Sequence, residues 1–206
     1  MFHILFRTQL YLILRETLAI CSRRIIRDSM TQLNVSRLLM ENFHLLQTTG
    51  LTKGVLDLAC GKGRNGLFLL HNNIPVTFAD NNPAALQYVA EQAEKEPTES
   101  QCWLVDLEIE NQNTIECKCF DAILVFNYLH RPLIEPIKNA VTSGGYLFYE
   151  TFTIQQRKFG RPQNLNYLLE PGELRSWLDG WHVVHYFEGE MDSPMRAIAS
   201  VVARKL

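Results

Sequence analysis

The segment from Val55 to Gly63 carries the strongest chemical signal in this chain. It reads Val-Leu-Asp-Leu-Ala-Cys-Gly-Lys-Gly, which predicts a short buried strand that contains an acid, Asp57, and then turns at glycines. A helical pattern from Arg64 to Leu70 follows at once. Glycines let a ligand approach the backbone, and a helix N-terminus attracts polar ligands. The segment therefore predicts a nucleotide-sized binding loop.

Acids follow the apolar runs of this region in a regular way. Asp57, Asp80 and Asp106 fall at or near the carboxyl ends of successive predicted strands. In a parallel sheet these ends share one edge, where ligands bind. An acid after the second strand is placed to accept hydrogen bonds from ribose hydroxyls, and one after the third can accept from the amine of adenine. The spacing predicts a nucleoside site.

The loop also satisfies the weak pattern Gly61-x-Gly63-x-x-Gly66, which permits an NAD(P)-binding oxidoreductase. Asp57 argues against that reading, because a carboxylate beside the turn repels a pyrophosphate and attracts a cation. The lysine pattern of a phosphate-binding Walker loop is absent, since Lys62 is not followed by Gly-Lys-Ser/Thr at the required spacing.

Strands and helices alternate through most of the sequence, which predicts a parallel sheet with helices on both faces. The predicted strands are 55–59, 75–79, 101–105, 120–126 and 146–152, then an antiparallel pair at 181–187 and 197–203. The predicted helices are 34–47, 64–71, 83–95, 133–141 and 171–178. Asn82 suits the cap of the third helix and Pro83 its first position. The pair Gly144-Gly145 predicts a turn before the fifth strand.

The stretch from Thr153 to Glu170 is long and polar for a loop of a compact domain. Loops of this length are commonly functional, so we expect an insertion or a lid here.

Composition excludes several classes of protein. The chain has 206 residues, 47% of them apolar, which fits a globular domain, and its net charge of −2 gives no reason to expect a nucleic-acid partner. The five cysteines have no regular spacing, which argues against a disulfide framework and a zinc site and favours reduced thiols in the cytoplasm. No metal site is expected, and the oligomeric state stays open.

We expect residues 1–33 to be a helical, apolar and arginine-rich extension before a domain at 34–206. Its apolar stretches are interrupted by Arg7, Arg15 and Glu16, so none reaches the length of a membrane span. Three interpretations stay open: a helix that covers the domain, a helix that contacts a membrane surface, or an extension upstream of the natural start.

These motifs resemble those of class I S-adenosylmethionine-dependent methyltransferases. Val55 to Gly63 matches their first motif, with Ala59 at the position where the first glycine is usual. The match extends through Asp80 and Asp106 and covers roughly residues 35 to 205. With Arg64 and Asn65 the first motif is most similar to the TehB-like (tellurite resistance) and thiopurine-methyltransferase-like branch, whose members act on small molecules.

The resemblance implies a Rossmann-like α/β fold, a doubly wound seven-stranded sheet that is mostly parallel with an antiparallel last strand. It also implies the cofactor S-adenosyl-L-methionine, with S-adenosyl-L-homocysteine as product. The implied cofactor-binding residues are Asp57, Ala59, Cys60, Gly61, Gly63, Arg64, Asn65, Asp80, Asn81, Asp106, Leu107, Phe126 and Asn127. Asp80 and Asn81 would bind the ribose, Asp106 and Leu107 the adenine, and Phe126 and Asn127 would border the methyl-transfer site.

The catalytic candidates follow the fourth strand. His130 and Tyr128 are the candidate bases, and Arg131 is a candidate to hold an anionic acceptor. Tyr149, Glu150 and Tyr167 are candidates for the acceptor side. The acceptor itself is expected to be a small molecule, such as a thiol or a chalcogen oxyanion. The alternatives are a cofactor-binding regulator or assembly protein without turnover, and the NAD(P)-binding oxidoreductase.

Overall fold

The computed structural model describes residues 35–48, 50–109, 115 and 118–206. The domain that begins at Ser36 and ends at Leu206 is one compact unit. The extension predicted for residues 1–33, together with its candidate membrane contact, lies outside the described residues. Among the helices that the structure describes, none is long and apolar enough to cross a membrane.

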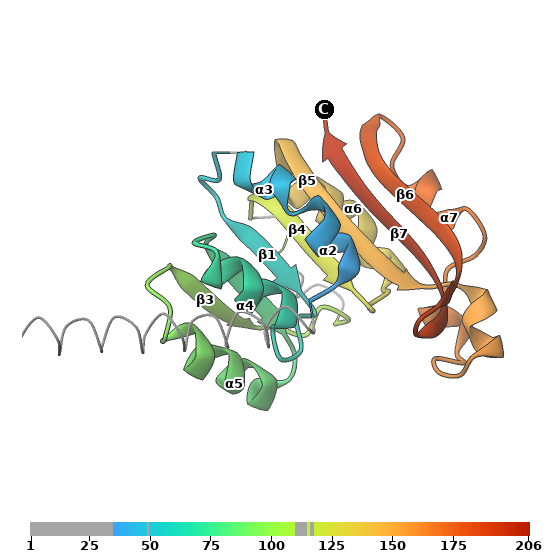
Figure 1. The fold of residues 1–206 in the computed structure, drawn as a ribbon, viewed down its shortest axis with the longest axis horizontal. Coiled ribbons are helices and arrows are strands. Elements are labelled where there is room, and N and C mark those ends of the chain that lie inside the picture. Colours follow the sequence, from blue (N-terminus) through green and yellow to red (C-terminus); the bar gives the residue numbers. More distant parts are fainter. Residues whose placement is uncertain (1–34, 49, 110–114, 116–117) are drawn as a thin grey trace, which may run out of the picture. The chain divides into compact units, whose positions relative to one another are not determined.

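The domain is built on a seven-stranded sheet in the order β3-β2-β1-β4-β5-β7-β6 (Figure 1). The strands are β1 Val55–Leu58, β2 Val76–Asp80, β3 Ser100–Leu104, β4 Phe120–Phe126, β5 Val141–Phe152, β6 Trp181–Asp192 and β7 Met195–Lys205. Strands β1 to β5 pair in parallel, whereas β7 is antiparallel to both of its neighbours, β5 and β6. The predicted fold, mostly parallel with an antiparallel last strand, is confirmed.

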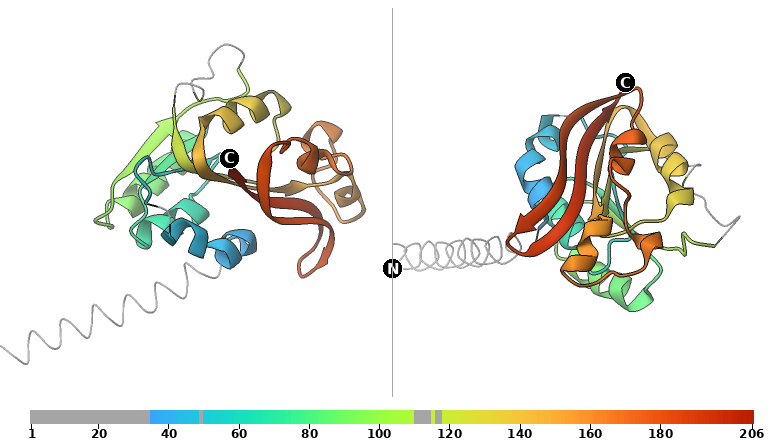
Figure 2. Two further views of the ribbon diagram at one scale, coloured as in Figure 1. Left: turned by 90° about the horizontal axis from the view of Figure 1, so that it is seen from above. Right: turned by 90° about the vertical axis from the view of Figure 1, so that its right-hand side faces the viewer.

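Helices cover both faces of this sheet (Figure 2). The helices are α2 Arg37–Asn42, α3 His44–Thr48, α4 Arg64–His71, α5 Pro83–Ala93, α6 Ile134–Ala140 and α7 Glu173–Ser176. The view from above places α2 to α5 on one face and α6 and α7 on the other. The predicted helix 34–47 is divided at Phe43, whose ring packs edge-on against Phe68 of α4 with centroids 5.0 Å apart.

Burial explains why the central strands form where they do. Every residue of β1 is buried, as expected of a strand covered on both faces. On the face of α6 and α7, Leu56 and Leu58 join one continuous core with Ile123 and Leu147. This core fixes the strand register, so the carboxyl ends of β1, β2 and β4 come together at one edge of the sheet.

Two local predictions differ from the structure. Gly144 and Gly145 do not form a turn before the fifth strand; they lie within β5, where its pairing with β4 shifts register between Phe120 and Ala122. A Cβ at Gly145 would lie 2.6 Å from the carbonyl oxygen of Asp121, so only glycine fits this irregularity. Strands β6 and β7 are also longer than predicted, because they continue into a tight hairpin.

The polar stretch 153–170 contains two short 3₁₀ helices, η3 Ile154–Lys158 and η4 Leu165–Tyr167. It follows β5 directly, so it lies at the edge of the sheet where the parallel strands end. A further 3₁₀ turn, η2 Arg131–Leu133, follows β4 at the same edge and leads into α6.

Candidate functional site

The glycine loop leaves β1 in a backbone conformation that L-residues rarely adopt. Ala59, Gly61 and Gly63 have φ of 52°, 53° and 70°, in the left-handed region. Gly63 is the cap residue of α4, and a Cβ there would lie 2.8 Å from Val89. At Gly61, by contrast, a Cβ would meet no atom within 4 Å, so this residue faces open space. The loop thus presents bare backbone to a ligand, which is what a bound nucleoside requires.

Asp57 lies beneath this loop. Its side chain is 3% exposed, and its Oδ2 accepts a hydrogen bond of 2.9 Å from the backbone N–H of Gly66 in the first turn of α4. Burial raises the pKa of Asp57 to about 7, although the Gly66 N–H and the charge of Arg64 oppose the shift and that of Asp80 adds to it. Asp57 therefore supports the loop, and its carboxyl group changes charge near neutral pH.

Asp80 connects the end of β2 to the loop and to α5. Its Oδ2 accepts from the N–H of Gly61 at 2.7 Å, and its Oδ1 accepts from the N–H of Asn82 at 2.9 Å. The Asn82 side chain in turn caps α5, as predicted, by accepting from the N–H groups of Ala84 and Ala85. Each carboxylate oxygen keeps a free lone pair, so Asp80 can still accept hydrogen bonds from a ligand.

A cavity of about 290 Å³ opens at this edge of the sheet. Its lining includes six of the cofactor-binding residues implied by the resemblance, Ala59, Asp80, Asn81, Asp106, Leu107 and Asn127, together with the candidate base Tyr128. Val105 and Glu108 complete it and were not foreseen. The acids Asp80 and Asp106 lie at or just after the ends of the neighbouring strands β2 and β3, so both line this cavity. We call this the nucleoside cavity.

Other implied cofactor residues have partners inside the protein. Asn65 is buried and its Oδ1 accepts from the N–H of Ser36 at 2.9 Å, so it holds the start of α2 against α4. Burial and the charges of Asp57 and Asp80 raise the pKa of the Cys60 thiol, which therefore stays protonated. Phe126 is buried at the end of β4. These residues shape the loop and the sheet edge from within.

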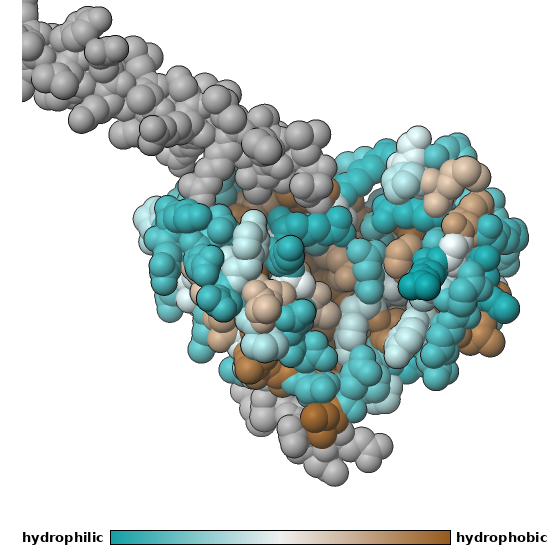
Figure 3. Space-filling view, turned by 90° about the horizontal axis from the view of Figure 1, so that it is seen from below, coloured by the Kyte–Doolittle hydropathy of each residue, from teal (hydrophilic) through white to brown (hydrophobic). Residues whose placement is uncertain are grey.

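A second cavity, of about 560 Å³, adjoins the first. It is lined by Glu108, Asn127, Tyr128, Leu129, Phe152, Arg161, Pro162, Gln163, Asn164 and Tyr167. Because Glu108, Asn127 and Tyr128 line both cavities, the two form one continuous cleft. The view from below, on the side where the parallel strands end, shows apolar side chains in a recess between hydrophilic rims (Figure 3). We call this second space the acceptor cavity.

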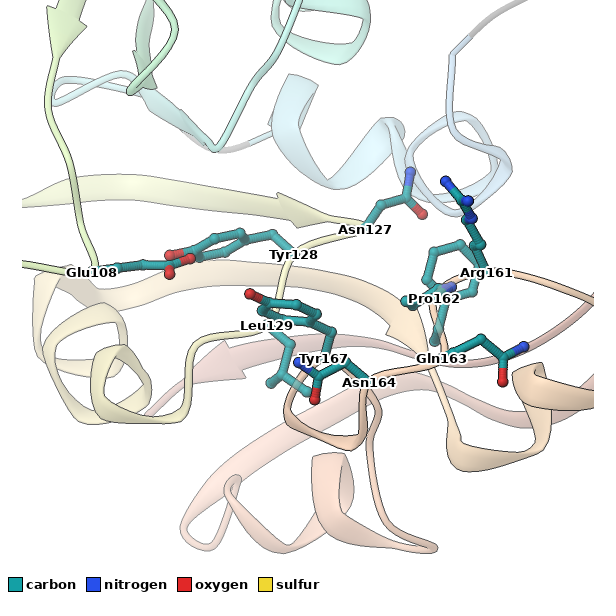
Figure 4. Close-up of a pocket in the computed structure, with 10 residues that line it drawn as sticks. Glu108, Asn127, Tyr128, Leu129, Arg161, Pro162, Gln163, Asn164 and Tyr167 are labelled. Carbon is teal, nitrogen blue, oxygen red and sulfur yellow. The ribbon is translucent and has the colours of Figure 1, made fainter.

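Polar and aromatic groups are arranged in order along the acceptor cavity (Figure 4). Glu108 and Tyr128 lie toward one end, Asn127 and Arg161 toward the other, and the ring of Tyr167 lies between them. Asn127 has a φ of 56°, and its N–H donates to the Glu150 carbonyl at 2.8 Å, which fixes its position at the junction of the cavities.

Tyr128 is half-buried at that junction, but it is unsuited to act as a base. Burial raises the pKa of its hydroxyl, and the nearby carboxylate of Glu108 raises it further through its charge and a hydrogen bond. The hydroxyl therefore remains protonated at neutral pH and donates its one proton to Glu108. The structure thus changes the interpretation of Tyr128 from candidate base to donor.

The interpretation of Arg131 as an anion-binding residue is not supported by the structure. Its Nε and Nη2 donate to the two carboxylate oxygens of Glu173 at 2.6 and 2.8 Å. Its Nη1 and Nη2 also donate to the carbonyl oxygens of Asn166 and Leu168, at 3.1 and 2.9 Å. Glu173 thus compensates the charge of the guanidinium, and four of its five N–H groups have partners. His130 directly precedes η2 and is not among the described residues that line either cavity.

The candidates for the acceptor side lie in three different places, and the two on β5 point to opposite faces of the sheet. Tyr149 is buried in the core, where its hydroxyl donates to the Tyr128 carbonyl at 3.0 Å. Glu150 points to the opposite face and pairs with Arg196 at 3.3 Å beside a separate cavity of about 440 Å³. Only Tyr167 of these candidates lines the acceptor cavity. The residues that line the cavity beside Tyr167 belong to the stretch 153–170, and the length and polarity of that stretch were the sequence signal that pointed to them.

Comparison with known proteins agrees with this geometry. The family model described as tellurite resistance protein TehB matches residues 32–196. The chain belongs to the TehB family. The TehB-like resemblance inferred from the first motif is thereby confirmed. Two curated TehB proteins of Haemophilus influenzae strains, both named as probable S-adenosyl-L-methionine-dependent methyltransferases, are 28% and 27% identical over 141 residues. That alignment covers 65% of this chain, which spans about half (48%) of these relatives' length.

Solved structures share the fold. TehB from Haemophilus influenzae superposes with a TM-score of 0.60 at 22% identity, over 80% of this chain and 62% of that one. A coclaurine N-methyltransferase bound to N-methylheliamine and S-adenosylhomocysteine gives 0.61 at 14% identity, over 81% and 72%. A TehB-like methyltransferase from Corynebacterium glutamicum gives 0.55 at 16% identity, over 79% and 86%.

Proposed function

We propose that this TehB-family domain is a methyltransferase that uses S-adenosyl-L-methionine and acts on a small molecule. The observation that carries the proposal is the continuous cleft, in which a nucleoside-sized cavity and a larger one share Glu108, Asn127 and Tyr128. Two adjoining compartments with a common wall suit a reaction that brings a nucleoside donor and an acceptor into contact.

The residues of the nucleoside cavity fit the proposed cofactor. Asp80 and Asp106 offer acceptors to hydroxyl and amine groups, and the open backbone at Gly61 leaves room for an adjacent chain. Below them Asp57 can carry a negative charge close to the loop. When bound, S-adenosylmethionine supplies a methyl group on a positively charged sulfur, and transfer to a nucleophile leaves a neutral thioether.

The chain's own residues contribute mainly by positioning. Asn127 is held at the junction by its backbone hydrogen bond to Glu150, and the hydrogen bond from Tyr128 to Glu108 holds the Tyr128 ring beside it. Alignment of the reacting groups supplies most of the rate in such a transfer. A soft nucleophile that is already anionic needs no base in the site.

The sheet order argues against the NAD(P)-binding alternative. Dinucleotide-binding sheets of the Rossmann type have the parallel order 3-2-1-4-5-6, whereas this sheet ends in β7-β6 with β7 antiparallel. The regulator alternative shares the cofactor and differs only in turnover, so a transfer assay separates it from the enzyme.

Calorimetric titration with S-adenosylhomocysteine tests the cofactor assignment. We expect micromolar binding, on the order of −8 kcal/mol, and a loss of about tenfold or more in Asp80→Ala, since a cofactor hydroxyl would lose its acceptor. Glu99→Gln, a change in an exposed carboxylate away from the cleft, is the control and should leave the affinity unchanged. Absence of binding to the folded wild-type protein would refute the proposal.

A further inference from the structure

The acceptor cavity is walled by aromatic rings and contains little charge. Tyr128 and Tyr167 face it from separate segments, and Phe152 adds a third ring. Tyr167 is 47% exposed, so its ring is available to a ligand rather than packed into the core. Aromatic side chains placed around a cavity favour flat, apolar ligands, which stack on their faces.

Arg161 is the one cation among the described residues that line this cavity. No described carboxylate pairs with it, in contrast to Arg131, whose charge is neutralised by Glu173. An isolated and accessible guanidinium is suited to bind a single carboxylate or similar anion. Glu108 at the other end of the cavity would repel a second negative charge.

The loop that carries these groups is held in shape by its own side chains. Gln156 is buried, donates to the Arg161 carbonyl at 3.1 Å and accepts from the N–H of Ala197 at 2.9 Å. The amide of Gln163 donates to the Gly160 carbonyl at 2.6 Å, and that of Asn164 accepts from the N–H of Asn166. These hydrogen bonds hold the loop in shape, and Arg161 and Tyr167 are the cation and the aromatic ring that it brings to the cavity.

From this arrangement we infer that the acceptor is a flat, ring-bearing organic molecule with one negative charge. Its ring lies between Tyr128 and Tyr167, and its anionic group meets Arg161. A bare chalcogen oxyanion fits poorly, because it would leave most of a 560 Å³ cavity unfilled and would find one cation where it needs several. The inference rests on the proposed function and adds the class of acceptor.

Binding to the protein loaded with S-adenosylhomocysteine tests the inference without knowledge of the reacting atom. The probes are 2-naphthoate, which is flat and anionic, 2-naphthamide, which is flat and neutral, and tellurite, which is an oxyanion without a ring. We expect 2-naphthoate to bind about tenfold more tightly than either of the others in calorimetric titration. Tellurite that binds as tightly as 2-naphthoate would overturn the inference.

Matched variants assign the contacts. Arg161→Gln should remove the preference for 2-naphthoate over 2-naphthamide, whereas Arg157→Gln, in an exposed arginine of the same loop, should leave it intact. Tyr167→Leu should weaken both naphthyl probes about tenfold, and Tyr88→Leu, in an exposed tyrosine of α5, should weaken neither. Equal effects of a variant and its control would also overturn the inference.

The failure modes are distinguishable. If S-adenosylhomocysteine does not bind, the proposed function fails before any acceptor probe is added. If it binds and neither naphthyl probe binds up to millimolar concentration, the proposed function stands and the inferred class of acceptor is wrong.

Discussion

The guanidinium of Arg131 holds the carboxylate of Glu173 through two parallel hydrogen bonds across 42 residues of chain. The same guanidinium donates to the carbonyl oxygens of Asn166 and Leu168, on either side of Tyr167. One side chain at the start of η2 thus fixes both the start of α7 and the segment that carries an aromatic wall of the acceptor cavity.

Removal of this contact should loosen that wall. We expect Arg131→Gln to accelerate backbone amide exchange over residues 164–169, measured by mass spectrometry, and to leave β1 and β2 unchanged. Glu173→Gln should loosen the same segment less, because the bonds from Arg131 to the Asn166 and Leu168 carbonyls remain, and the double variant should resemble Arg131→Gln. Unchanged exchange over residues 164–169 in Arg131→Gln would contradict this role and favour the original anion-binding interpretation.

The same ion pair should contribute to acid sensitivity. Burial alone would raise the pKa of Glu173, but the hydrogen bond from Arg131, the N–H of Glu170 and the Arg131 charge more than offset it, so the pKa is lowered. A lowered pKa gives stability that is present above the usual value of about 4.3 and is lost as pH falls through the folded-state pKa. Glu173→Gln should therefore lose stability at neutral pH and approach the wild type in acid, measured by urea unfolding.

Tyr128 should remain protonated throughout the neutral range. Burial and the Glu108 carboxylate raise the pKa of its hydroxyl, so ultraviolet difference spectra between wild type and Tyr128→Phe should show no tyrosinate below pH ~10. Tyr167→Phe serves as the comparison in the same cavity. A tyrosinate signal that Tyr128→Phe removes near pH 8 would restore Tyr128 as a candidate base.

The local sequence pattern could indicate the residues of the nucleoside cavity because they lie at or just after the ends of strands. An apolar run that stops at Asp80 or Asp106 identifies both the strand and the acid, and parallel pairing brings these ends together. Asn127 and Tyr128 follow β4 in the same way, so their place beside Asp80 and Asp106 could be expected from the sequence alone.

Residues whose roles depend on distant partners could not be predicted in this way. Asn65 is in the right motif, but its side chain binds Ser36, 29 residues earlier. The engagement of Arg131 likewise depends on Glu173. In the loop 153–170, the exposure of Arg161 depends on Gln156, which bonds to β7. No local pattern contains these pairings, because they exist only once the sheet has formed.

The buried acid under the glycine loop predicts a pH dependence of opposite sign to that of Glu173. The pKa of Asp57 rises from an ordinary value near 3.9 to about 7. Between these values the folded state binds more protons at Asp57 than the unfolded state, so the contribution of Asp57 to stability is greatest below pH ~4 and is lost as pH rises through 7. The slope from one group is at most about 1.4 kcal/mol per pH unit.

Asp57→Asn should remove this slope, because an amide oxygen can still accept from the Gly66 N–H but carries no charge. Urea unfolding at several pH values measures the difference between variant and wild type, which should grow between pH ~4 and 7 in favour of the variant. Glu99→Gln again controls for a change in net charge. Parallel curves for wild type and Asp57→Asn would show that Asp57 ionises normally.

The final prediction concerns Ala59, which stands where related loops have glycine. Its φ of 52° costs an L-residue about 1 kcal/mol, and glycine avoids most of this cost despite its greater freedom in the unfolded chain. Ala59→Gly should therefore raise the free energy of unfolding by about 0.5 kcal/mol, without weakening S-adenosylhomocysteine binding.

The matched control for that substitution is Ala84→Gly, in the exposed first turn of α5, where a helical φ favours alanine. Ala84→Gly should lower the free energy of unfolding by up to about 1 kcal/mol. The two substitutions remove the same methyl group, so opposite signs would show that backbone conformation decides the outcome. If Ala59→Gly destabilised the protein as much as Ala84→Gly, the methyl group of Ala59 would have to contribute packing that outweighs its left-handed backbone.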